Sequence, residues 1–313
     1  MRCHRLTFSL MFLSMAVGLA IQTTPVRGQE PIKIAVGVDS AFVAAYVAKR
    51  NKLFEKRGVN VELVQFTQGG DGLDAVVAGQ IPIGGGGEPT TMLRAARADL
   101  KVLGVISQSG TYIKLVVKPE ISDPKQLKKL GIVPGSVNEF VTEQMLAKYG
   151  VDPSTVTFVR AGPPEFPALF ARGDVDGYFL WEPWPANGVK QGGKILLASG
   201  DVGYVYNLWL SANGAWLEKN TAAAKSIMAA LSDACELVRA DPAVGAAAVQ
   251  AEAKIPAAIA TDMLKEVQCV VRDFTPSDLS TYEKIAAFLK SKKLLPAGFD
   301  AKKIFQVGFF SPK

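Results

Sequence analysis

The amino-acid sequence predicts an α/β fold arranged as two lobes, with additional helices covering one of them. Three observations support this. Strand-like and helix-like segments alternate over roughly the first two hundred residues, one helix–strand segment recurs further along the chain, and the last third is rich in alanine and helical in pattern. The 313 residues are 49% hydrophobic and 20% charged, which fits packed cores and excludes global disorder.

Residues 1–28 have the pattern of an export signal. Arg2, His4 and Arg5 form a positive start, and an apolar run without acidic residues follows to about Ile21. This run of roughly 15 apolar residues is short of the ~20 that a membrane-spanning helix needs. We therefore expect cleavage near Gln29 and export to the periplasm.

Removal of this signal changes the charge and the available chemistry. Three arginines leave, so 35 basic residues become 32 against 29 acidic ones, and the net charge falls from +6 to about +3. That charge is too mild to indicate a nucleic-acid partner. The single histidine, His4, also leaves, which excludes Ser-His and Cys-His nucleophiles and a histidine-ligated zinc site. We therefore expect no catalysis, no cofactor and no metal.

Two cysteines remain in the mature chain, Cys235 and Cys269. In an oxidising compartment they could form a disulfide, but two cysteines in so long a chain are not a disulfide scaffold. Two small buried thiols fit the sequence equally well. Their spacing leaves both alternatives open.

Local patterns place the elements in order along the chain. Apolar residues that alternate or run together predict strands at 32–38, 59–63, 101–107, 112–117 and 131–133. Helices are predicted at 41–57, 71–78 and 137–149, with Gly58 and Gly150 as stop signals for the first and last, and with a turn at 68–70. Alanine-rich helices are predicted at 221–239, 242–253, 256–266 and 277–291, and we expect them to cover one lobe.

One segment recurs at a constant offset of 94 residues. Residues 73–89 align without gaps to residues 167–183, so that Gly79 matches Gly173 and two Glu-Pro pairs coincide. Each copy is a helix, a glycine, a short strand and a Glu-Pro corner, which indicates duplicated lobes; a chance match is the alternative. Because ligands bind outside the carboxyl ends of such strands, we expect both corners to face one shared cleft.

The order and spacing of several motifs resemble a known family. The motifs are AAYVAKRNKLFEKRG at 44–58, DAVVAG at 74–79, GEP at 87–89, PGS at 134–136, FARGDVDG at 170–177 and WEPW at 181–184. Together they resemble the periplasmic solute-binding proteins of ABC importers for nitrate, sulfonates and taurine, which share a domain with thiamine-pyrimidine-synthesis proteins. One departure, QLKKLG at 126–131 in place of the usual D-L-K-G-K pattern, falls in a predicted surface loop.

The resemblance implies a type II periplasmic-binding-protein fold, in which two α/β lobes close over a ligand by a hinge motion. The chain would cross between lobes twice. Lobe one would comprise residues 29–113 and 203–313, and lobe two residues 114–202. The implied partners are a small-molecule ligand and an inner-membrane ABC permease with its ATPase, and the protein would be a monomer.

The resemblance also implies which residues line the cleft. Carried over position by position, they are Ser40, Ala41, Phe42, Gln68, Gly69, Glu88, Pro89, Thr90, Ser109, Gly135, Ser136, Val137, Glu165, Trp181 and Glu182. Three of these stretches, at 69–71, 88–90 and 135–136, lead into predicted helices. Helix N-termini bind sulfonate, carboxylate or nitrate through free N–H groups, although ordinary capping explains the same residues.

The acidic residues near this cleft argue against a ligand that is only an anion, such as nitrate. Asp39, Glu88, Glu165 and Glu182 fall at or beside it, whereas Arg160 is the one nearby guanidinium. If these acids do not simply face solvent or cap turns, the ligand also carries N–H donors, as an amino-sulfonate or an aminopyrimidine does. The aromatic residues Phe42, Tyr112, Trp181 and Trp184 either stack on a planar ligand or pack at the hinge.

Three functions are compatible with these patterns. The first is a binding component of an ABC importer for a sulfonate, taurine, nitrate or a similar organic anion; a ligand such as a thiamine pyrimidine precursor is the alternative within this function. The second is a pyrimidine-synthesis-type enzyme, which by the resemblance would need an active-site histidine and iron that the sequence does not support. The third is a binding lobe that serves a sensor. The sequence does not separate the first from the third.

Overall fold

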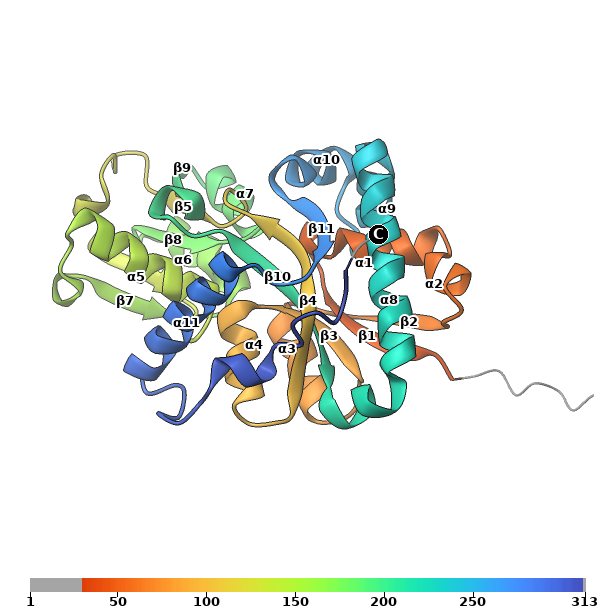
Figure 1. Cartoon of the computed structure of the whole chain (residues 1–313). Helices are drawn as coiled ribbons and strands as arrows, with labels where there is room; N and C mark the ends of the chain where they lie inside the picture. The colour runs from red at the N-terminus through yellow and green to blue at the C-terminus, as the bar shows by residue number, and fades with distance from the viewer. Residues whose placement is uncertain (1–29, 312–313) are drawn as a thin grey trace, which may run out of the picture. The chain divides into compact units, whose positions relative to one another are not determined.

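The structure is a computed structural model, and it describes residues 30–311. By its contacts the chain divides into residues 1–30 and residues 31–313, and the second unit carries the fold described below (Figure 1). The predicted export signal at 1–28 lies outside the described residues. Within the described range, none of the helices is both long and apolar enough to cross a membrane.

The first sheet has six strands in the order β11-β4-β10-β3-β1-β2. Its strands are β1 (Ile32–Gly37), β2 (Val61–Phe66), β3 (Ile83–Gly87), β4 (Leu100–Ser109), β10 (Tyr206–Asn213) and β11 (Gln268–Arg272). β1 pairs in parallel with β2 and β3, whereas β10 runs antiparallel between β3 and β4. The three parallel strands bring their carboxyl ends to one edge, where ligands bind in such sheets.

The second sheet repeats this plan with five strands in the order β7-β6-β8-β5-β9. They are β5 (Lys114–Val117), β6 (Lys129–Ile132), β7 (Thr157–Arg160), β8 (Gly177–Leu180) and β9 (Lys194–Ala198). β6 is parallel to β7 and β8, and β5 runs antiparallel between β8 and β9. β3 and β8, the strands of the two copies of the recurring segment, therefore occupy equivalent places in the two sheets.

Helices follow the strands on both sheets, which gives the predicted mixed α/β architecture. They are α1 (Val43–Arg50), α2 (Leu53–Lys56), α3 (Gly69–Val77), α4 (Glu88–Ala95), α5 (Val137–Tyr149), α6 (Phe166–Ala171) and α7 (Trp184–Lys190). α5 has the predicted bounds, because Ser136 caps its start and Gly150 ends it with φ +66°. The helix predicted at 41–57 is wrong in one respect, since it breaks at Lys52, whose backbone is left-handed.

The C-terminal third adds helices to the first sheet, in agreement with the alanine-rich pattern. They are α8 (Gly214–Ala240), α9 (Pro242–Ala253), α10 (Ala257–Glu266) and α11 (Pro276–Ser291). α8 and α9 pack against α1, and α11 packs against α4 (Figure 1). Cys235 on α8 and Cys269 on β11 form a disulfide. Of the two alternatives that the sequence left open, the structure therefore has the disulfide and not two separate thiols.

Short 3-10 helices complete the described chain: η1 (Ser40–Phe42), η2 (Pro124–Gln126), η3 (Pro153–Thr155), η4 (Pro163–Glu165), η5 (Ser199–Val202) and η6 (Ala301–Ile304). The chain passes from the first sheet to the second between β4 and β5, and it returns between β9 and β10. These two crossing segments are hydrogen-bonded to each other, because the Gly200 N–H donates to the Gly110 carbonyl at 2.6 Å. We call the first and second sheets, each with its helices, lobe one and lobe two; the exact boundaries at 113/114 and 202/203 stay a prediction.

Candidate ligand-binding site

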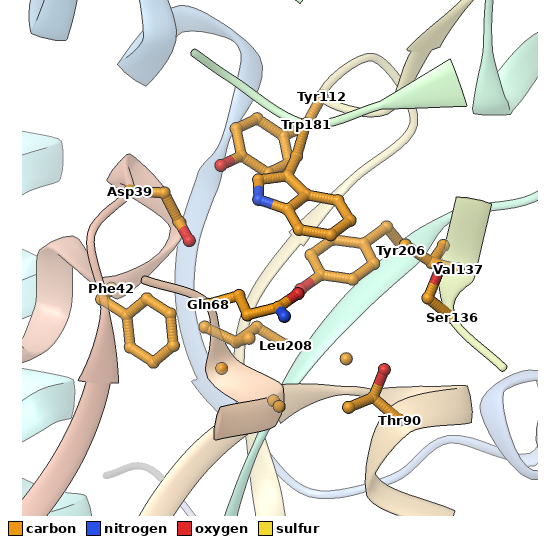
Figure 2. Close-up of a pocket in the computed structure, with 14 residues that line it drawn as sticks. Asp39, Phe42, Gln68, Thr90, Tyr112, Ser136, Val137, Trp181, Tyr206 and Leu208 are labelled. Carbon is orange, nitrogen blue, oxygen red and sulfur yellow. The ribbon is translucent and has the colours of Figure 1, made fainter. Parts of the chain in front are cut away.

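A cavity lies between the ends of strands from both lobes. Its empty volume, including the part open to solvent, is about 480 Å³. The lining residues come from the carboxyl ends of β1, β2, β3 and β8, from the first crossing segment, from β10 and from the starts of three helices (Figure 2): Asp39, Phe42, Gln68, Gly69, Gly70, Gly86, Gly87, Thr90, Tyr112, Ser136, Val137, Trp181, Tyr206 and Leu208. This position, beyond the carboxyl ends of parallel strands, is the one expected for a ligand site.

Three helix N-termini reach this cavity. α3 begins at Gly69, α4 begins directly after Gly87, and α5 begins at Val137, and all three helices contribute lining residues from their first turn or cap. The first-turn N–H groups of a helix have no partner within the helix, and the helix dipole adds partial positive charge there. The cavity therefore offers N–H donors to an anionic group from both lobes.

Glycine is required where the α3 terminus meets β3. A Cβ added at Gly69 would lie 2.7 Å from the Gly85 carbonyl oxygen, which is backbone and cannot rotate away. The missing side chain lets the start of α3 pack directly on the strand and leaves its N–H groups uncovered. On β3, the GGGG run at 84–87 also lacks side chains, which allows Phe42 and Leu73 to pack against this strand. Phe42 and Leu73 occupy the space that side chains on Gly85 and Gly86 would need.

The hydroxyl of Ser136 is committed to its own helix. Its Oγ accepts from the Asn138 N–H at 3.2 Å and donates to the Val133 carbonyl at 2.8 Å. Ser136 lines the cavity, but its oxygen serves as the N-cap of α5. Gly135 does not line the cavity, and its N–H donates to the Glu139 carboxylate at 2.7 Å.

Aromatic rings form the walls of the cavity. Figure 2 shows Tyr112, Trp181 and Tyr206 around its centre and Phe42 at one side. The ring centroids of Tyr112 and Tyr206 are 6.1 Å apart. Burial raises the pKa of both tyrosines well above the ordinary value, so their hydroxyls stay neutral, and the Tyr112 hydroxyl is hydrogen-bonded to Asp39.

Asp39 is the acidic residue that lines the cavity. Its side chain is 7% exposed, and its Oδ1 accepts from the Ala41 N–H at 2.8 Å at the start of η1. Burial raises the pKa of its carboxyl to about 6, which hydrogen bonds from the Ala41 N–H and the Tyr112 side chain oppose. The lining contains neither lysine nor arginine.

The structure brings together about half of the residues predicted for the cleft. Seven line the cavity: Phe42, Gln68, Gly69, Thr90, Ser136, Val137 and Trp181. Eight do not: Ser40, Ala41, Glu88, Pro89, Ser109, Gly135, Glu165 and Glu182. Of these, Ser109 accepts from the Tyr112 N–H and donates to the Glu266 carbonyl, which places it at a lobe crossing, and Glu165 is exposed to solvent.

The two Glu-Pro corners do not present their carboxylates to the cavity, contrary to expectation. Glu88 is fully buried and accepts from the Tyr204 hydroxyl at 2.6 Å and from the Asn207 N–H at 2.9 Å. Glu182 pairs with the Lys114 ammonium at 2.8 Å and accepts from the Ala186 N–H at 3.1 Å. Glu88 thus bonds to the second crossing segment and to β10, and Glu182 bonds to β5 and α7, because a buried carboxyl group must find hydrogen-bond partners.

Sequence reasoning missed several lining residues. Asp39 was expected at or beside the cleft, and Tyr112 was expected either to stack on a planar ligand or to pack at the hinge. Gly70, Gly86 and Gly87 flank predicted positions. Tyr206 and Leu208 were missed outright, because they lie on β10, a strand that the sequence did not predict. Trp184, expected as a stacking candidate, packs within lobe two beside Tyr178 instead.

The fold matches that of known binding proteins. The structure resembles that of the periplasmic aliphatic sulphonate binding protein SsuA from Escherichia coli with a TM-score of 0.79 and 22% identity, over 91% of this chain and 95% of that one. This likeness shows a two-lobed periplasmic-binding-protein fold. A family model described as NMT1/THI5 like matches residues 39–244, and the chain belongs to this family.

Two curated relatives from Escherichia coli (strain K12) agree with this assignment. The chain is 29% identical over 178 residues to a taurine-binding periplasmic protein, over 56% of this chain and 55% of that one. It is 27% identical over 240 residues to a putative aliphatic sulfonates-binding protein, over 74% of this chain and 75% of that one. The chain thus spans about half the length of the first relative and three quarters of the second, and both relatives are solute-binding proteins.

Proposed function

We propose that this protein is the periplasmic solute-binding component of an ABC importer and that it captures a small organic sulfonate between its two lobes. One observation carries the proposal: the N-termini of α3, α4 and α5, from both lobes, converge on one cavity. The sulfonate- and taurine-binding relatives support the same ligand class.

A sulfonate group suits this cavity for chemical reasons. Its three oxygens share one negative charge, and each accepts hydrogen bonds from N–H groups that arrive from different directions. Helix N-termini bind such groups without a full positive charge, which accords with a lining that contains neither lysine nor arginine. The Thr90 hydroxyl points into the cavity (Figure 2) and adds a donor from lobe one.

The remaining parts of the proposal follow from this role. A binding protein of this kind releases its ligand unchanged, so we expect no turnover. Its partners would be a membrane permease and an ATPase, and the protein would act as a monomer after removal of residues 1–28 in the periplasm. The aromatic walls give some support to a planar heterocycle as the alternative ligand.

A thermal-shift screen of the purified mature protein tests the ligand class. The panel comprises ethanesulfonate, taurine, nitrate, an aromatic carboxylate and an aminopyrimidine. A sulfonate present at 100 times its Kd should add about 2.7 kcal/mol to the unfolding free energy. Stabilisation by the pyrimidine or by nitrate alone would contradict a sulfonate site, and stabilisation by none of the panel would contradict the proposed function.

A matched pair of variants then locates the site. Thr90→Val removes the hydroxyl at nearly constant volume and should weaken sulfonate binding by about 1.5–3 kcal/mol, the usual value of a hydrogen bond to a charged group. Thr157→Val makes the same change on the exposed strand β7 and should leave the Kd unchanged. Calorimetry measures both. Equal affinities for the two variants would place the ligand elsewhere.

A further inference from the structure

The carboxylate of Asp39 is a buried acid for which the proposed sulfonate site has no use. It lies at the end of β1 with 7% of its surface exposed, and it lines the cavity. No lysine or arginine contributes to the forces on this carboxyl; its partners are the Ala41 N–H and the Tyr112 side chain. Burying a carboxylate without a cationic partner costs desolvation free energy. A cationic group of a ligand can offset this cost by pairing with the carboxylate.

Among the residues that the structure describes, no charged side chain forms a hydrogen bond or an ion pair with Asp39. Tyr46 from α1 donates its hydroxyl to the Gly37 carbonyl. Tyr112 lies near Asp39 on the first crossing segment, and Tyr206 lies near it at the start of β10. Burial keeps all three phenols neutral by raising each pKa. Lys114 is paired with Glu182 and Glu266, and the carbonyl oxygen of Glu182 lies 3.4 Å from the Tyr112 hydroxyl.

Asp39 and the donors at the starts of α4 and α5 lie on different sides of the cavity. The start of α3 lies near Asp39, because a Cβ added at Gly37 would be 3.2 Å from the Asp39 Oδ2 and 3.3 Å from the Gly69 nitrogen. Figure 2 shows Asp39 and Tyr112 on one side, Thr90 and Ser136 on the other, and the rings of Trp181 and Tyr206 between them. Aromatic faces attract an ammonium group, and a carboxylate attracts it more strongly, whereas the same carboxylate repels a bare anion. The cavity thus has a cation-favouring end and an anion-favouring end.

We infer that the ligand is a zwitterionic amino-sulfonate, whose ammonium group binds Asp39 while its sulfonate binds the N-termini of α4 and α5. This inference rests on the proposed function, because it assigns the second end of the same ligand. Asp39 is then the residue that selects amino-sulfonates over sulfonates without an amine. Its hydrogen bond to the Ala41 N–H is also what an ordinary cap would make, so the test must remove the charge and keep the cap.

The Asp39→Asn variant meets this requirement, since its amide oxygen still accepts from Ala41. Two ligands serve as probes: taurine, and isethionate, in which a hydroxyl replaces the ammonium group. We expect calorimetry to show that the wild type binds taurine at least tenfold more tightly than isethionate. Asp39→Asn should weaken taurine binding at least tenfold and leave isethionate binding equal or tighter. Asp174→Asn, an exposed acid on lobe two, should change neither.

The pH dependence gives an independent readout. Asp39 takes up a proton as the pH falls through about 6, so taurine affinity should decline there while isethionate affinity does not decline. If the wild type binds both probes equally and Asp39→Asn changes neither, the proposed function stands and this inference is wrong. If the wild type binds no sulfonate at all, the proposed function itself fails and the inference fails with it. Melting temperatures of the empty variants establish that each is folded.

Discussion

Glu88 is the buried acid whose replacement should change stability most clearly with pH. Its carboxyl is fully buried at the start of α4 and is held by the Tyr204 hydroxyl and the Asn207 N–H. Burial raises its pKa from 4.5 to about 8, against the lowering effect of these hydrogen bonds. Glu88→Gln replaces the acid with a neutral side chain of the same shape, which can accept from Asn207 and donate to Tyr204.

The sign and size of the effect follow from this raised pKa. Between pH 4.5 and 8 the folded protein holds a proton on Glu88 that the unfolded chain releases, so stability from this group is full at low pH and is lost as the pH rises. A shift of about 3.5 units corresponds to about 5 kcal/mol at 1.36 kcal/mol per unit. The free energy of unfolding of Glu88→Gln relative to the wild type should therefore increase by about 4 kcal/mol from pH 5 to pH 9.

Urea unfolding at several pH values measures this difference, because all other titrating groups are common to both proteins and cancel. Glu165→Gln is the matched control, since Glu165 is exposed to solvent and should show a difference that is small and flat with pH. A Glu88→Gln difference that is independent of pH would refute the reasoning. It would mean that Glu88 ionises alike in the folded and unfolded protein.

Two further predictions concern stability. Replacing both Cys235 and Cys269 with alanine should lower the free energy of unfolding by about 3 to 4 kcal/mol, the loop-closure value for a separation of 34 residues; urea unfolding without reductant measures it, and an unchanged midpoint would contradict it. Ser136→Ala should cost about 1 kcal/mol through the lost N-cap of α5 and leave sulfonate affinity within about threefold, so a large loss of affinity by calorimetry would show that the hydroxyl contacts the ligand instead.

The parts of the fold that the sequence predicted well are those with local signals. α5 has its predicted bounds because a residue next to each end marks that end: a serine caps the first turn, and a glycine with positive φ follows the last. The strand β1 and the helix α9 follow equally plain patterns. The stretches at 69–71 and 135–136, which were predicted to lead into helices, could therefore be assigned to the cavity in advance, because their position after a strand is a local property.

The parts that it missed depend on contacts across the sequence. β10 is buried on both faces and is held by β3 and β4, about a hundred residues earlier, so it lacks the alternation that marks a half-buried strand. Its absence from the prediction removed Tyr206 and Leu208 from the expected site. The break before α2 was also missed. Lys52 takes a left-handed conformation there, and the sequence has no glycine or proline at this position that would predict a break.

At the two Glu-Pro corners, local sequence predicted the position in the sheet but not the direction of the side chain. The recurring segment correctly indicated equivalent places in two sheets, but the direction of each carboxylate was set by donors from elsewhere in the chain: Tyr204 and Asn207 for Glu88, and Lys114 for Glu182. Neither acid therefore needs a ligand: burial keeps Glu88 protonated up to a pH of about 8, and Glu182 is paired with Lys114. Among the described acidic residues, the lining is left with Asp39 alone, and the charge that a ligand meets in this cavity is therefore set by one side chain.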